Sequence, residues 1–167
     1  MAAVKSILGH SATASVRYYT AFLQRRDVTG GTYTLLIEVA EQTTIEIGAL
    51  GMQRFPAGAY AYTGSAFGPG GFGRVDRHYE LAAGDRDARH WHIDYLLGHE
   101  GVSIRGDVRT VDADIECPVA RVLPDAPVAG FGASDCGCSS HLAYDEDGGR
   151  LREAVTSAHR DAESNVE

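Results

Sequence analysis

The chain contains almost no lysine: among its 15 basic side chains Lys5 is the only lysine, and the others are arginine. Basic residues are also outnumbered, 15 against 23 acidic residues, which gives a formal net charge of −8. Because affinity for phosphate normally comes from a basic surface, this balance argues against the simplest kind of nucleic-acid-binding protein. Excess carboxylate resembles the halophilic proteins of salt-loving archaea, whereas a GC-rich genome explains the arginine equally well.

The chain also lacks a long apolar segment. No run approaches the roughly 20 residues that a membrane-spanning helix requires, so we expect a soluble, cytoplasmic protein without membrane contact. Residues 1–29 carry four basic residues against one acid, but their apolar stretches are too short for a secretory signal. We interpret them as a basic, poorly ordered extension; a mitochondrial-type transit peptide or an overlong start-codon assignment would have the same composition.

Cysteine is scarce as well. Three cysteines are an odd number in a chain without an export signal, which favours reduced thiols or metal ligands over a disulfide framework. Cys136, Cys138 and His141 form a C-x-C-x-x-H cluster, and Cys117 is the remaining cysteine. These four ligands could close a tetrahedral structural zinc site, although the spacing is not that of a standard zinc finger; buried thiols are the alternative.

The residues that are present suffice for one globular domain, since 44% of them are hydrophobic. Apolar and polar residues alternate over residues 33–40 and 44–48, which predicts two strands joined as a hairpin through residues 41–43. The other elements expected in this part of the chain are a loop over 51–58, a strand over 59–64 with Tyr60 and Tyr62 on one face, and a strand over 102–111.

After the glycine-rich run at residues 68–73 the apolar period becomes helical. An apolar stripe of Phe72, Val75, Tyr79 and Ala82 lies opposite a face with Arg74, Arg77, His78 and Leu81. Arg74 and His78, four residues apart, are therefore expected on one polar face of a helix.

The remaining segments complete a mixed α/β domain. Residues 90–97 are ambiguous between helix and strand, and residues 115–123 and 150–160 predict helices. We expect a single domain over residues 30–160, with a small central antiparallel β-sheet flanked by helices, followed by a polar tail over residues 161–167.

One glycine pattern points to nucleotide binding. Gly68, Gly70 and Gly73 spell GxGxxG, and Asp94 follows about twenty residues later, where the dinucleotide fingerprint has an acid. The preceding strands are predicted to form hairpins, however, and strands do not alternate with helices. We therefore interpret the run as a flexible connector and rank a dinucleotide-binding enzyme third.

A second pattern joins short motifs along the chain. GTY at residues 31–33 opens the first strand, YTG at residues 62–64 closes the third, and Arg74 and His78 follow. This set resembles the GIY-YIG nuclease superfamily. The resemblance extends to a mainly archaeal branch of uncharacterised function, whose members occur alone or attached to DNA repair enzymes. The segments that carry it are YAYTGSA (60–66), RH (77–78), HWHIDYLL (90–97), EC (116–117) and FGASDCGCSSHL (131–142).

The resemblance implies divalent-metal-dependent cleavage of DNA phosphodiester bonds, with Mg²⁺ or Mn²⁺ as cofactor and DNA as substrate. By resemblance Arg74 binds the phosphate and Glu116 holds the metal. Tyr33 and Tyr62 are the tyrosine pair, one of which orients or deprotonates the attacking water. His78 matches a phosphate donor or auxiliary base, and His90 or His92 could act similarly.

General chemistry agrees with these roles. Arginine donates bidentately to phosphate and keeps its charge, and a hydrated Mg²⁺ on one carboxylate can neutralise the leaving oxygen. A free tyrosine has a pKa of about 10, so a tyrosine base needs a neighbouring cation or metal. Each residue taken singly also has a structural explanation, as a core aromatic or a solvated charge, but the ordered set favours the nuclease.

One departure from the superfamily supports a competing function. Many catalytically studied members have a lysine directly after the glycine of the second motif, where this chain has Ser65. The alternative is a non-catalytic, zinc-stabilised module that binds nucleic acid or a partner repair protein. The local charge is compatible with either, because residues 48–78 carry three arginines against one acid, and residues 142–167 carry three arginines against seven acids.

Overall fold

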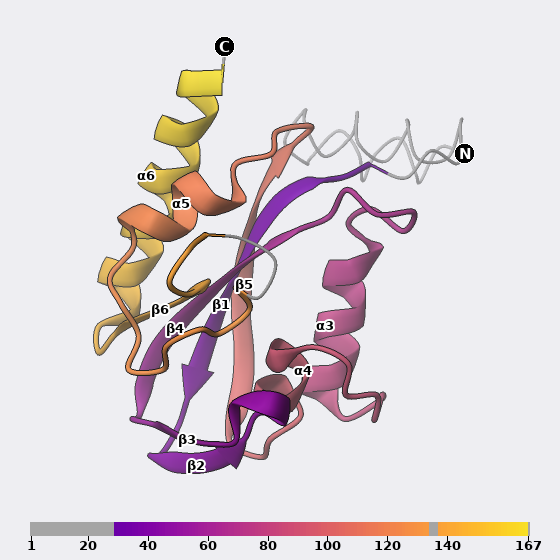
Figure 1. The fold of residues 1–167 in the computed structure, drawn as a ribbon, viewed down its shortest axis with the longest axis vertical. Helices are drawn as coiled ribbons and strands as arrows, with labels where there is room; N and C mark the ends of the chain where they lie inside the picture. The colour runs from indigo at the N-terminus through magenta and orange to yellow at the C-terminus, as the bar shows by residue number, and fades with distance from the viewer. Residues whose placement is uncertain (1–28, 134–136, 167) are drawn as a thin grey trace, which may run out of the picture.

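The computed structural model of the protein describes residues 29–133 and 137–166 (Figure 1). At its centre is a four-stranded antiparallel sheet in the order β5-β1-β4-β6. The expected mixed α/β fold with a small antiparallel sheet is confirmed. The strands are β1 (Gly31–Val39), β4 (Gly58–Ser65), β5 (Val102–Val111) and β6 (Leu142–Asp145). The extension predicted for residues 1–29 lies outside the described residues, apart from residue 29.

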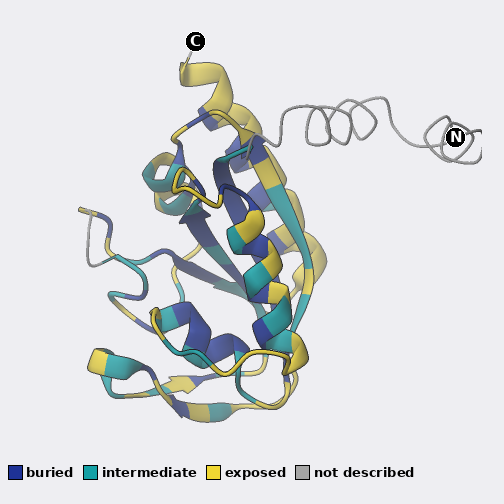
Figure 2. Ribbon diagram, turned by 90° about the vertical axis from the view of Figure 1, so that its right-hand side faces the viewer, coloured by how far each residue is buried: buried dark blue, intermediate teal, exposed yellow. Residues whose placement is uncertain are grey.

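Helices cover both faces of this sheet. Successive side chains of a strand point to opposite faces, so Tyr33 and Leu35 of β1 face one side and Leu36 faces the other. The first side packs against α3 (Gly73–Ala83) and α4 (His92–Leu97), and the second against α5 (Glu116–Val122) and α6 (Gly148–Val166). Figure 2 shows that buried positions follow the sheet and the inward sides of the helices, while the outer side of α6 is exposed.

The hairpin predicted for residues 33–40 and 44–48 is wrong. The second segment forms β2 (Thr43–Glu46), which pairs with β3 (Met52–Phe55) across the 3-10 turn η1 (Gly48–Leu50). β3 lies inside the segment predicted to be a loop. Both edges of β1 are already occupied, by β4 and by β5, so β2 has no edge of β1 to pair with.

The buried face of α3 is shifted from the predicted one, although Phe72 and Val75 of the predicted apolar stripe are buried. Val75, His78 and Leu81 are buried, whereas Tyr79, assigned to the apolar stripe, is 36% exposed and donates a hydrogen bond to Asp107. A buried polar side chain needs a partner, and β1 supplies one for His78, as described below. A polar residue can therefore face the sheet here, and the prediction was wrong in placing Tyr79 on the buried side and His78 and Leu81 on the polar side.

The remaining elements agree with the sequence to different degrees. The ambiguous segment 90–97 forms α4, and the helix predicted over residues 115–123 and the strand over 102–111 are present as α5 and β5. α6 continues to residue 166 and buries Ala162, past the end of the predicted helix. The four-residue strand β6 was not predicted. None of the helices in the described part of the chain is both long and apolar enough to cross a membrane.

Candidate active site

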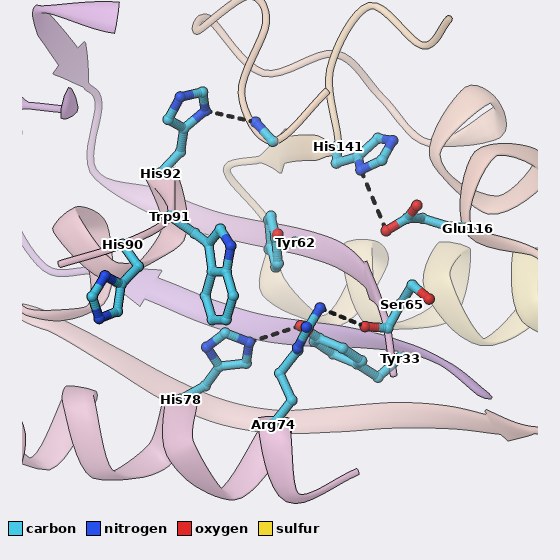
Figure 3. A pocket seen from close by; sticks show the side chains of 11 residues that line it. Tyr33, Tyr62, Ser65, Arg74, His78, His90, Trp91, His92, Glu116 and His141 are labelled. Carbon is cyan, nitrogen blue, oxygen red and sulfur yellow. Dashed lines mark hydrogen bonds and ion pairs between the residues drawn. The ribbon is translucent and has the colours of Figure 1, made fainter. Parts of the chain in front are cut away.

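A cleft of about 290 Å³ opens on the α3 side of the sheet (Figure 3). All five residues predicted to be catalytic line it, although they come from β1, β4, α3 and the start of α5. These residues are Tyr33, Tyr62, Arg74, His78 and Glu116. The fold thus brings into one cleft residues that are up to 83 positions apart in the chain.

Tyr33 and His78 form the buried wall of the cleft. The distance between Tyr33 Oη and His78 Nε2 is 2.7 Å, and both side chains are only 1% exposed. Gly64, the glycine of the YTG motif, is what makes room for the phenol: a Cβ atom at this position would lie 2.5 Å from Tyr33 Oη. The two motifs are therefore complementary, because the tyrosine of the first lies against the glycine of the second.

Both tyrosines of the cleft keep their protons at neutral pH. Burial raises the pKa of Tyr33 well above its ordinary value, Tyr62 and Glu116 add to this shift, and Arg74 opposes it. Burial, followed by Glu116, likewise raises the pKa of Tyr62. Arg74 favours the phenolate form of each tyrosine, as the sequence led us to expect, but burial outweighs it.

His78 is a neutral imidazole. Burial lowers its pKa from 6.5 to about 4; Asp94 opposes the shift, and Arg77 and Arg74 add to it. Its Nδ1 atom is buried and has no hydrogen-bond partner among residues 29–133 and 137–166. A buried lone pair without a partner is less costly than a buried N–H without one. We therefore assign the ring hydrogen to Nε2, which makes Tyr33 Oη the acceptor and leaves the phenolic hydrogen available to the cleft.

Arg74 lies at the mouth of the cleft, and two contacts position it. Its Nη1 donates to the backbone carbonyl of Ser65, 2.9 Å away, and its guanidinium carbon lies 4.7 Å from the centroid of the Trp91 ring. The contact with residue 65 uses the main chain. A serine in place of the lysine of many superfamily members is therefore compatible with this position of Arg74.

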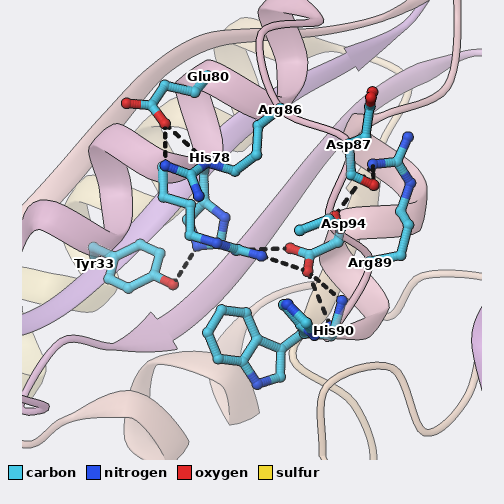
Figure 4. A network of polar contacts seen from close by, with 11 residues as sticks. Tyr33, His78, Glu80, Arg86, Asp87, Arg89, His90 and Asp94 are labelled. Carbon is cyan, nitrogen blue, oxygen red and sulfur yellow. Dashed lines mark hydrogen bonds and ion pairs between the residues drawn. The ribbon is translucent and has the colours of Figure 1, made fainter.

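A buried carboxylate organises the segment between α3 and α4 (Figure 4). Asp94 is 0% exposed and accepts two hydrogen bonds from Arg77, of 3.0 and 2.9 Å, and two from the backbone N–H groups of His90 and Trp91. Burial acts to raise the pKa of Asp94, but the hydrogen bonds outweigh it and lower the value. Asp94, which the glycine pattern had suggested as a ribose ligand, is instead a structural anion, and the antiparallel sheet does not fit a dinucleotide fold.

His90 and His92 also line the cleft. His92 Nδ1 accepts a hydrogen bond from the backbone N–H of Gly132, 2.9 Å away, and burial lowers the pKa of His92. His92 therefore connects α4 to the loop that closes the far side of the cleft. His90 stands next to Trp91, with its ring centroid 6.3 Å from that of the indole.

Glu116 lies beside a group of soft ligands. One ligand atom from each of Cys117, Cys138 and His141 falls within 4.8 Å of the others, close enough to hold one metal ion. Cys117 Sγ is 3.9 Å from His141 Nε2, and the other ring nitrogen, Nδ1, is 3.7 Å from Glu116 Oε2. Burial lowers the pKa of His141, which keeps it neutral as a metal ligand must be. The fourth predicted ligand, Cys136, lies outside the described residues.

Sequence reasoning missed Trp91 and the contact between Glu116 and His141. Trp91 lines the cleft and is the only tryptophan of the chain, but it stood unremarked inside the apolar segment 90–97. The histidines on both sides of it were the available signal, since such a segment is unusual in a buried core. The contact between Glu116 and His141 joins the start of α5 to the loop before β6, which no local pattern reveals.

The protein is thus a single-domain α/β protein with a polar cleft that contains Arg74. Beside the cleft, Cys117, Cys138 and His141 lie close enough together to hold one metal ion. Residues 32–164 match the family described as Domain of unknown function DUF123, and the chain belongs to that family. Neither the curated proteins nor the solved structures include a match to this chain.

Proposed function

We propose that the protein is a divalent-metal-dependent DNA endonuclease of the GIY-YIG type, acting in DNA repair or processing. The observation that carries the proposal is the cleft itself, which all five motif residues line. Chance would not be expected to gather a tyrosine pair, an arginine, a histidine and a glutamate from four separate elements in one cleft.

In the proposed reaction Arg74 binds the non-bridging oxygens of the scissile phosphate. A guanidinium suits this role because it donates in a planar fork and stays charged. The phenolic hydrogen of Tyr33 donates to the attacking water or to the phosphate, while His78 Nε2–H holds the phenolic oxygen in place. Tyr62 provides a second hydroxyl in the same cleft, and its protonated state suits a hydrogen-bond donor.

Glu116 is the residue that would hold Mg²⁺ or Mn²⁺. The site fits such an ion, because Mg²⁺ is usually bound by one or two carboxylates together with waters and substrate phosphates. Glu116 lies in the cleft with its side chain 24% exposed, whereas Asp94 already accepts four hydrogen bonds. When bound, the ion would acidify water and neutralise the charge of the leaving oxygen.

The test is cleavage of labelled branched and single-stranded DNA with Mg²⁺ or Mn²⁺ in high salt. We expect Arg74→Ala and Glu116→Ala to reduce the rate by at least about 100-fold, as the loss of one charge-stabilising group does in other enzymes. The matched controls are Arg105→Ala and Glu38→Ala, an exposed pair 3.9 Å apart that does not line the cleft. Cleavage by both cleft variants at the wild-type rate would contradict the proposal.

We further propose a structural Zn²⁺ bound by Cys117, Cys138 and His141. Thiolates and a neutral imidazole are the ligands that zinc prefers, and Cys117 Sγ lies 3.9 Å from His141 Nε2. Metal analysis of native protein should find zinc that Cys138→Ser loses, with Ser139→Ala as control. Equal zinc content in both variants would contradict this site.

The second candidate function is a non-catalytic module that binds DNA or a repair protein through the same cleft. The protonated tyrosines favour it, since neither is poised as a base. Binding of branched DNA that Arg74→Ala abolishes, with no cleavage under any divalent metal, would select this module over the nuclease.

A further inference from the structure

Trp91 is the most exposed aromatic side chain on the wall of the cleft. It is 43% exposed, although a large apolar ring is usually buried, and it lies between His90 and His92 at the start of α4. Figure 3 shows the indole at the centre of the cleft, with Arg74 beside it. An exposed ring in this place needs an explanation other than core packing.

The ring is held firmly although it is not buried. The backbone N–H of Trp91 donates to Asp94 Oδ2, 3.0 Å away, which fixes the main chain. The guanidinium carbons of Arg74 and Arg77 lie 4.7 and 4.6 Å from the ring centroid, and Asp94 in turn holds Arg77 through two hydrogen bonds. Trp91 is therefore a preorganised ring with two guanidinium groups over it, one of them from the proposed phosphate ligand, and its 43% exposure leaves part of the ring open to solvent.

We propose that Trp91 stacks on an unpaired nucleobase next to the phosphate bound by Arg74, so that the substrate is DNA with a single-stranded segment at the cleavage site. This inference rests on the proposed function and adds the class of substrate to it. In an intact duplex the faces of each base are covered by its neighbours, and only an unpaired or extruded base offers a face to a protein aromatic. Arginine beside an aromatic ring is a recurring combination in single-strand binding.

The experiment uses the fluorescence of the full-length protein, in which Trp91 is the only tryptophan. A short oligothymidylate and a blunt duplex are titrated without added divalent metal, and binding is followed in parallel by the anisotropy of a label on the DNA. We expect the single strand to quench the tryptophan with saturation and to bind more tightly than the duplex. Trp91→Ala should weaken single-strand binding by about 5- to 150-fold, the range found for loss of one stacking aromatic.

Two control variants separate stacking from loss of structure. Trp91→Phe keeps a ring and should retain most of the affinity, and Tyr79→Ala removes an exposed aromatic that does not line the cleft and should leave the affinity unchanged. Single-strand binding without a change in fluorescence, or an equal loss of single-strand and duplex affinity in Trp91→Ala, would overturn the inference. The nuclease would survive that result if Arg74→Ala still abolished cleavage, whereas absence of binding and cleavage with every DNA would reject both.

Discussion

Two buried histidines lie on opposite faces of the central sheet, and they contact two consecutive residues of β1. On the α3 face His78 bonds to Tyr33, and on the α6 face His159 Nε2 is 2.7 Å from Thr34 Oγ1. His159 Nδ1 is also partnered, by Thr110 Oγ1 at 2.8 Å, and Thr34 reaches Thr63 Oγ1 at 2.9 Å. One histidine thus belongs to a closed network, and the other keeps a nitrogen without a partner among the described residues.

The two histidines have similarly lowered pKa values, but their hydrogen-bond partners differ. Burial is the first cause of the lowered pKa of both histidines, about 4 in each case. The pKa therefore does not distinguish the candidate site from the core. What distinguishes them is the partner, because the phenol of Tyr33 borders a cleft and the threonine hydroxyls do not. A perturbed histidine indicates function here only together with an opening to solvent.

The largest expected difference between the faces is catalytic. Tyr33→Phe removes the hydroxyl that His78 holds, and we expect DNA cleavage to fall by about 100-fold or more. Thr34→Val, the adjacent substitution on the other face, should leave the rate of cleavage per folded molecule unchanged. Gel assays at matched concentrations of folded protein make the comparison. A similar loss of activity in Thr34→Val would show that the two faces are not functionally separate.

The next effect is on stability and falls on the opposite face. His159→Leu leaves the hydroxyls of Thr34 and Thr110 in a buried site without their imidazole partner, and we expect a loss of about 2–3 kcal/mol in the free energy of unfolding. His78→Leu should cost less, about 1 kcal/mol, because it removes one hydrogen bond together with a buried unpartnered nitrogen. Urea denaturation of both variants gives the order, and the reverse order would contradict the assigned networks.

A third variant tests the fit between Tyr33 and the YTG motif. Gly64→Ala brings a Cβ atom to within 2.5 Å of Tyr33 Oη, so the phenol must move, at an expected cost of about 1–2 kcal/mol and with loss of cleavage. Gly73→Ala is the control, since a Cβ atom there meets nothing within 4 Å among the described atoms. Equal stability and activity of the two variants would mean that Tyr33 does not depend on this glycine.

The last prediction concerns the dependence of stability on pH. Histidine has a pKa of 6.5 before folding and about 4 in His78 and His159, so the unfolded chain takes up protons first as the pH falls. The stabilisation that comes from keeping these histidines neutral is therefore fully present above pH 6.5 and is lost as the pH falls from 6.5 to 4. The pKa values of His92 and His141 are also lowered, so these two residues act in the same direction. Each proton contributes at most about 1.4 kcal/mol per pH unit.

His159→Leu should reduce the slope of stability against pH by about one proton, and His78→Leu by a similar amount. Urea denaturation at several pH values between 7 and 4.5 measures both slopes. An unchanged slope in either variant would contradict the lowered pKa of that histidine.

Local sequence patterns predicted most strands but not their pairing, and the residues of the cleft were expected from the family resemblance. The strand β1 could be recognised because apolar side chains recur at every second position, whereas β2 and β3 pair only with one another and β6 has four residues. Which face of α3 is buried depends on Tyr33, which lies 45 residues away from His78. Trp91 and the contact between His141 and Glu116 are likewise tertiary, so no periodicity within one segment could disclose them.

Side chains of β1 have specific partners on both faces of the sheet, so an insertion or deletion within this strand would disturb both faces. Side chains alternate strictly along a strand, so one inserted residue before Tyr33 would turn the phenol toward His159 and a threonine toward the cleft. His78 and His159 would then both lose their partners in β1. Insertions and deletions are therefore easier to accommodate in the connecting loops than within residues 31–39. In this strand the alternation of side chains determines at once which residues face the cleft and which face α6.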